Sequence, residues 1–154
     1  MTGKGYVVEM GSWKKVGFPD SAITRGIGSC LGIAILNKDE KIGYLGHFIG
    51  YPEEEVEFIA DLAIKEAGNP GKLEVIVAGN MPVSLEGEDI WINIEFGNRA
   101  EIDYNAWLRR MLRERGIKNL FEYLLVYPVN FSYEMEVDTE KLLVDVREEH
   151  YEEN

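Results

Sequence analysis

The pattern of apolar and polar positions predicts β-structure in the first third of the chain. Residues 6–10 alternate between apolar and polar side chains, which is the period of a half-buried strand. Residues 11–25 lack such a pattern and are predicted to form a loop. Two short apolar runs follow, at 31–36 and 42–49, with polar residues between them. This arrangement predicts a β-hairpin.

The clearest helical pattern begins after Pro52. Apolar side chains recur on one helical face over residues 56–67, and the three glutamates before them favour the positive end of a helix. Gly68 and Pro70 are residues that end helices, so the helix is expected to stop there. A second helix is predicted over about residues 103–115, which a glycine also follows.

The remaining apolar runs predict further strands and set the fold class. They lie at residues 73–78, 121–127, 131–137 and 142–146, with a less regular one at 90–96. Strands, helix, strand, helix and strands do not alternate as an all-parallel doubly wound sheet requires. The order favours an α+β sandwich with mostly antiparallel or mixed sheets and two main helices.

Length and composition predict one domain with an acidic tail. A chain of 154 residues with 45% apolar composition is large enough to bury a core without metal or disulfide support. The domain is expected to span residues 1–147, and the glutamate-rich residues 148–154 are interpreted as a solvated tail. The start of the sequence lacks the order of a signal peptide, and no apolar run is long enough for a membrane span. We therefore expect a soluble, cytoplasmic protein.

Charge narrows the range of partners. The chain has 28 acidic and 16 basic residues, for a net charge of -12. Such a surface repels a phosphate backbone, so nucleic acid is not expected as a partner. A closed zinc site of the usual cysteine and histidine kind is not expected either, because the sequence has one cysteine and two histidines.

Cys30 and His47 are the candidates for chemistry. A single cysteine is a buried hydrophobe, a stray thiol or a reactive group, and a histidine beside Phe48 is often only structural. A four-residue hairpin loop at 37–40 would place Cys30 directly opposite His47. Side chains paired in this way have Cβ atoms about 4.5 to 5.5 Å apart, within reach of a thiol–imidazole interaction. The prediction depends on the hairpin register.

The residues around Cys30 admit a functional and a structural interpretation. Gly26, Gly28 and Gly32 let the backbone approach a ligand and direct N–H groups at an oxyanion, but a plain tight turn would use the same glycines. Thr24 could orient the imidazole through its hydroxyl or its carbonyl, as the third member of a nucleophile, base and orienter set. A strand-edge threonine without a role is the alternative.

Several segments resemble the chemotaxis receptor-modifying glutamine deamidases called CheD, whose fold is shared by the deamidating domain of cytotoxic necrotizing factor. The segment from Thr24 to Cys30 resembles the family's Thr-x-Gly-Leu-Gly-Ser-Cys motif, and Gly46-His47 lies where the family has its catalytic histidine. Residues 77–81 resemble a turn after the family's central strand. The sequence departs from the family after His47 and in the segment around Asn130.

The resemblance implies an α/β/β sandwich and a cysteine-dependent amidohydrolase, a protein-glutamine deamidase without metal or cofactor. The implied catalytic residues are Cys30, His47 and Thr24, and the implied substrate- or oxyanion-binding residues are Gly28, Ser29 and Asn80. A receptor-like protein would be the substrate, or a chemotaxis phosphatase the partner. Two alternatives stay open: a non-catalytic CheD-like binding module, and a hydrolase of a small amide or ester on the same scaffold.

Overall fold

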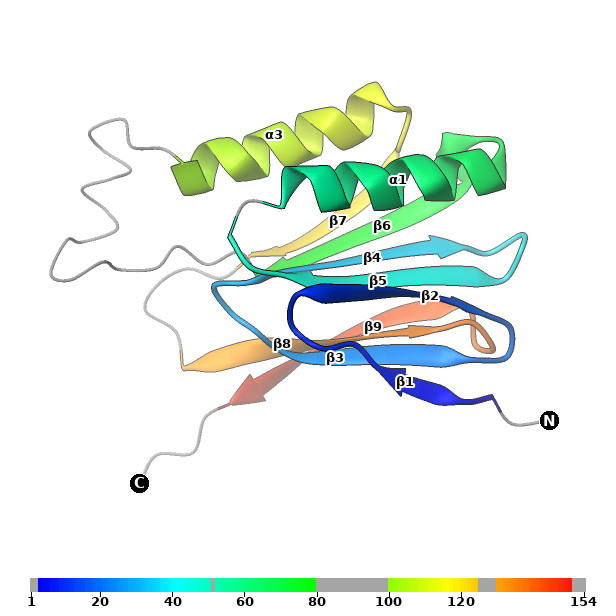
Figure 1. Cartoon of the computed structure of the whole chain (residues 1–154), viewed down its shortest axis with the longest axis horizontal. Helices are drawn as coiled ribbons and strands as arrows, with labels where there is room; N and C mark the ends of the chain where they lie inside the picture. The colour runs from blue at the N-terminus through cyan, green and yellow to red at the C-terminus, as the bar shows by residue number, and fades with distance from the viewer. Residues whose placement is uncertain (1–2, 51, 80–99, 125–129, 151–154) are drawn as a thin grey trace, which may run out of the picture.

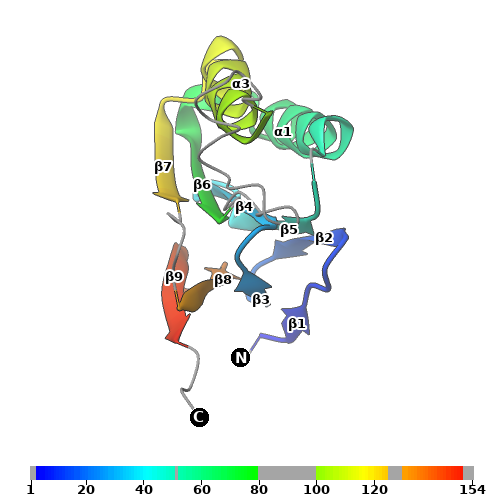
Figure 2. The same ribbon diagram turned by 90° about the vertical axis from the view of Figure 1, so that its left-hand side faces the viewer.

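Two helices and two sheets form three layers in the computed structural model of the chain, which describes residues 3–50, 52–79, 100–124 and 130–150. The helices cover one face of a five-stranded sheet, and a four-stranded sheet packs on its other face (Figure 1). Figure 2 shows the same three layers from the side. The predicted α+β class and the sandwich of two helices on two sheets are confirmed.

The five-stranded sheet lies in the middle of the molecule. Its strands, in spatial order, are β2 (Ser12–Gly17), β5 (Ile42–Phe48), β4 (Leu31–Asn37), β6 (Leu73–Gly79) and β7 (Asn119–Leu124). Only the β6–β7 pair is parallel. The predicted strands at 31–36, 42–49 and 73–78 are confirmed, and the one predicted at 121–127 begins two residues earlier.

The second sheet has four strands. In spatial order they are β1 (Gly5–Val7), β3 (Ser21–Ile27), β8 (Phe131–Asp138) and β9 (Leu143–His150). Its β1–β3 pair is parallel, and its other pairs are antiparallel. Because β9 runs to His150, residues 148–150 of the expected acidic tail belong to this sheet, while residues 151–154 lie outside the described part.

Two hydrophobic clusters hold the layers together through β4. Leu31, Ile33 and Ile35 pack in the cluster beneath the helices, whereas Ala34 and Leu36 pack in the cluster between the sheets. Every residue of β4 is buried, because the strand has a covered layer on each side. The run of apolar residues in the sequence reflects this double burial.

Both predicted helices are present. Helix α1 is Glu53–Ala67, and Gly68 ends it with φ of 77°, a left-handed conformation that glycine adopts without strain. Helix α3 is Ala100–Glu114, with Gly116 shortly after it at φ of 93°. Neither of these helices, nor any other in the described ranges, has the length and apolar character needed to cross a membrane.

The prediction of a loop over residues 11–25 is wrong, because this segment forms β2 and most of β3. Strand β2 is the edge of its sheet and exposes part of each face, so its side chains do not alternate cleanly. Its conformation comes from pairing with β5, a partner thirty residues away in the register Ser12↔His47 to Gly17↔Ile42. The strand predicted at 90–96 lies outside the described residues.

Candidate functional site

The chain passes from one sheet to the other at the predicted nucleophile segment. Strand β3 ends at Ile27 in the four-stranded sheet, and β4 begins at Leu31 in the five-stranded sheet. A β-bulge precedes the crossing, since Thr24 pairs with Met135 but Ile27 pairs with Tyr133. A bulge bends its strand and redirects the side chains beside it, and bulges are frequent next to active sites. Residues 28–30 are therefore held where the two sheets meet.

The hairpin register differs from the predicted one. Asn37 pairs with Ile42, so the four-residue loop is 38–41, one residue later than expected, and Gly32 lies opposite His47. The direct pairing of Cys30 with His47 is therefore wrong. Relative to the prediction, each residue of β4 pairs with a residue of β5 that lies two positions further along the chain. Because side chains alternate between the faces of a sheet, a shift of two leaves them on the same face.

Thr24 and His47 meet between the two sheets. The hydroxyl of the fully buried Thr24 donates to the Val8 carbonyl at 2.7 Å, and the same oxygen lies 2.7 Å from Nδ1 of His47. A threonine hydroxyl has one proton, which the Val8 carbonyl already accepts. Nδ1 must therefore donate its hydrogen to Thr24, and Nε2 of the neutral ring carries the lone pair. Thr24 acts on the imidazole through its hydroxyl, which was one of the two predicted routes.

The other ring nitrogen of His47 is an acceptor without a partner. Nε2 is buried and has no hydrogen-bond partner among the described residues, and the side chain as a whole is 3% exposed. Burial lowers the pKa of His47 from its ordinary value of 6.5, so the ring is neutral at neutral pH. A buried nitrogen without a partner is costly in a folded protein. It is the arrangement expected of a group that completes its hydrogen bonding with a reactant.

The lowered pKa of His47 predicts a specific dependence of stability on pH. Below about pH 6.5 the unfolded chain binds a proton at this ring more readily than the folded chain does, so the free energy of unfolding falls as pH falls. The slope from one such group is at most about 1.4 kcal/mol per pH unit. We expect His47→Gln to lose less stability than the wild type between about pH 7 and pH 5. Urea unfolding at each pH tests this, and parallel curves for the two proteins would contradict it.

Cys30 lies in the bend before β4 and is almost sheltered from solvent. It is 9% exposed, and its sulfur lies 3.7 Å from the sulfur of Met10. Burial raises the pKa of the Cys30 thiol, and a hydrogen bond from Ser29 offsets part of that effect. Since Nε2 of His47 has no partner, the thiol and the imidazole are not hydrogen-bonded in this state. At rest the thiol and the imidazole are therefore both neutral, and no hydrogen bond joins them.

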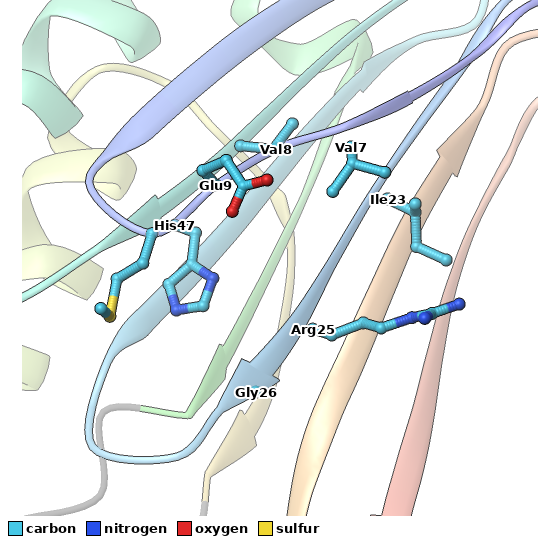
Figure 3. Close-up of a pocket in the computed structure, with 8 residues that line it drawn as sticks. Val7, Val8, Glu9, Ile23, Arg25, Gly26 and His47 are labelled. Carbon is cyan, nitrogen blue, oxygen red and sulfur yellow. The ribbon is translucent and has the colours of Figure 1, made fainter.

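A cavity of about 410 Å³ reaches His47 from the surface. Val8 and Glu9 form one wall, and Ile23 and Gly26 of β3 contribute to the other (Figure 3). Three further residues, Val7, Met10 and Arg25, complete the lining. The volume is within the range of sites that hold small molecules or single side chains. Cys30 is not among the lining residues, but the Met10 side chain that contacts it is.

Gly79 packs closely against the bend formed by residues 28–30. It ends β6 with φ of 82°, and a Cβ atom there would lie 2.5 Å from the carbonyl oxygen of Cys30 and 3.1 Å from that of Gly28. The methyl of Ile27 would also be too close. Only glycine lets β6 approach the bend so closely.

The structure thus brings Thr24 to His47, whereas the Cys30 sulfur contacts Met10 and makes no hydrogen bond to His47. Gly28 and Ser29 lie in the bend with the cysteine, whereas Asn80 lies outside the described residues. Sequence reasoning missed the Val8 carbonyl and the Met10 side chain, whose positions depend on the packing of the β1–β2 turn. The alternation at residues 6–10 was the one available signal, and it predicted a strand rather than a site.

Comparisons with known proteins found structural similarity only. No family model and no curated protein matches the sequence. The hypothetical protein YfiH of Bacillus licheniformis is 12% identical, with a TM-score of 0.46 over 66% of this chain and 46% of that one. Protein NMB0706 of Neisseria meningitidis, of the family DUF152, is 9% identical, with a TM-score of 0.43 over 78% of this chain and 63% of that one. The chain spans less than two thirds of the length of either protein.

Proposed function

We propose that the chain is a cysteine-dependent amidohydrolase that deamidates glutamine side chains of a protein. The observation that carries the proposal is the buried Thr24–His47 hydrogen bond, which leaves Nε2 of this cavity-lining histidine as an unpartnered acceptor. Cys30 lies at the same junction of the two sheets and supplies the nucleophile. The resemblance of residues 24–30 and 46–47 to the CheD family supports the same assignment and the choice of glutamine.

In the first half of the proposed reaction, Nε2 of His47 removes the proton of the Cys30 thiol as the sulfur attacks the side-chain amide carbon. The C–S bond forms, and negative charge develops on the amide oxygen. His47 then returns the proton to the amide nitrogen, the C–N bond breaks, and ammonia leaves. Because both groups are neutral at rest, the proton moves only once a substrate brings thiol and imidazole together.

The second half of the reaction hydrolyses the thioester. His47 removes a proton from water, the water oxygen attacks the thioester carbon, and the C–S bond breaks to leave a glutamate side chain and the regenerated thiol. Both halves develop charge on the same oxygen. Backbone N–H groups of residues 28–30 would stabilise it, because the bend places this backbone around the sulfur. The hydrogen bond from Ser29 to the sulfur favours the thiolate during attack.

A matched pair of threonine variants tests the role of Thr24. Thr24 and Thr139 are both fully buried, and the Thr139 hydroxyl also donates to a carbonyl, that of Asp20, at 2.5 Å. Thr139→Val removes one buried hydrogen bond and should cost about 1 to 2 kcal/mol of stability, whereas Thr24→Val removes two and should cost about twice as much. Only Thr24→Val removes the hydrogen bond that fixes the tautomer and orientation of the His47 imidazole.

We expect Thr24→Val to lower kcat about 10- to 100-fold and to alter the pH profile of kcat, with Thr139→Val near the wild type. Initial rates of ammonia release and thermal melting of both variants are the measurements. Equal activity of the two variants would contradict the orienting role, since both lose the same kind of bond.

The substrate is proposed to be a protein side chain rather than a free small amide. The cavity is bordered by exposed apolar residues, Val7 at 69% and Met10 at 59% exposure, which a protein surface would cover on docking. A chemoreceptor-like helix with a surface glutamine has the required chemistry, and this choice of substrate rests on the CheD resemblance alone.

A second candidate is a non-catalytic protein-binding module. Two observations favour it: burial raises the pKa of the Cys30 thiol, and the thiol makes no hydrogen bond to His47. A module would use the exposed apolar rim for docking and would leave the thiol inert. The two candidates differ in one product, because only the enzyme releases ammonia from glutamine.

A further inference from the structure

Met10 covers the Cys30 thiol from the side of the cavity. Its sulfur lies 3.7 Å from the Cys30 sulfur, and its side chain lines the cavity that reaches His47. Cys30 itself does not line that cavity and is only 9% exposed. Met10 thus contacts the thiol on one side and lines the cavity that His47 also lines.

The main chain around Met10 is held in place. The N–H of Val8 donates to Ile23 at 2.8 Å, and the N–H of Gly11 donates to the carbonyl of His47 at 2.6 Å. On the far side, Ser12 donates to the Glu9 carbonyl through its N–H at 3.1 Å and its hydroxyl at 2.7 Å. The turn is therefore anchored on both sides of Met10, and movement at this point falls to the side chain.

The Met10 side chain is suited to such movement. Methionine is unbranched and rotates about three side-chain bonds, and its thioether packs against varied partners at little cost. Met10 is 59% exposed, so solvent is available to the displaced thioether. Rotamer changes of exposed side chains take picoseconds to nanoseconds, far faster than enzyme turnover.

We propose that Met10 is a side-chain gate over Cys30, which controls the access of an electrophilic carbon to the thiol. With the gate closed, the thiol faces the thioether and is shielded from the cavity. An entering glutamine side chain displaces the thioether and takes its place against the Cys30 sulfur. The proposal deepens the proposed function, because it takes Cys30 as the nucleophile, and it makes the size of residue 10 a determinant of which acyl groups react.

Alkylation of Cys30 by iodoacetamide tests the gate without any substrate. The full chain is treated at about pH 8.5, where part of the thiol is ionised, and the rate is followed by intact mass. We expect Met10→Ala to react about tenfold or more faster than the wild type, and the bulkier Met10→Trp to react more slowly. Phe58→Ala is the control, because Phe58 of α1 is 58% exposed, close to the 59% of Met10, and is not among the residues that line the cavity; its rate should equal that of the wild type.

Each departure from this order overturns the gate. Equal rates for the wild type and Met10→Ala would show that the side chain shields nothing. Acceleration in Phe58→Ala as large as in Met10→Ala would show general loosening instead. Acceleration in Met10→Trp would exclude a steric cover, since a bulkier side chain cannot open the path. Alkylation in the expected order together with no release of ammonia from any glutamine substrate would leave the gate standing and refute the proposed function.

Discussion

Replacement of Cys30 by alanine is expected to abolish glutamine deamidation, with a loss of at least about 10⁴-fold in kcat. No other cysteine exists in the chain to replace the sulfur as nucleophile. The variant removes one buried sulfur atom, so it should lose only about 1 kcal/mol of stability and melt within a few degrees of the wild type. The measurements are initial rates of ammonia release and a thermal melt on the same preparation.

The two histidines provide the control for this loss. His47→Ala should slow the reaction by a factor comparable to that of Cys30→Ala, because Nε2 of His47 moves the proton in both halves of the proposed reaction. His150→Ala should leave the rate unchanged, since His150 lies in β9 with its imidazole exposed and bonded to Glu148. A slow His150→Ala, or a Cys30→Ala variant with full activity, would refute the assignment of the pair.

Gly79→Ala is expected to have the largest effect on stability. The added methyl would meet the carbonyl oxygen of Cys30 and the side chain of Ile27, both fixed by packing, and φ of 82° already strains a residue with a side chain. Strain and collision together should cost about 3 to 5 kcal/mol, which lowers the melting temperature on the order of 10 °C in a domain of this size.

Gly68→Ala separates the two contributions. Gly68 has nearly the same φ, 77°, and a Cβ atom there would meet nothing within 4 Å. It should therefore lose only the strain energy of about 1 to 2 kcal/mol. Chemical denaturation of both variants gives the difference. If Gly79→Ala were no less stable than Gly68→Ala, the close approach of β6 to the nucleophile bend would be disproved.

Much of the fold could be predicted because its signals are local. The bounds of α1 follow from an acidic first turn, one apolar face and Gly68, all within a short segment. Strand β2 could not be found in this way. Residues such as Lys14 and Lys15 lie on an edge strand whose conformation comes from pairing with β5, and no local pattern encodes that partner.

The contact between Thr24 and His47 could be predicted from the sequence, whereas the register of the hairpin could not. The loop length of the β4–β5 hairpin was correct, but the turn begins after Asn37, whose side chain accepts a hydrogen bond from the N–H of Glu40 at 3.1 Å. That displacement of one residue moves Cys30 away from the position opposite His47. The contact of Met10 with Cys30 joins the β1–β2 turn to the β3–β4 bend, each of which connects the two sheets, and sequence spacing alone gives no measure of such a contact.

Deamidation by the wild-type protein in water labelled with ¹⁸O tests the central claim most directly. Helical chemoreceptor fragments that contain glutamine are incubated with the protein, with Cys30→Ala as the matched control, and analysed by tandem mass spectrometry. We expect the wild type, but not Cys30→Ala, to convert a glutamine into a glutamate that carries one labelled oxygen, since water opens the thioester. An unchanged glutamine with the wild type, or equal conversion by Cys30→Ala, would contradict it.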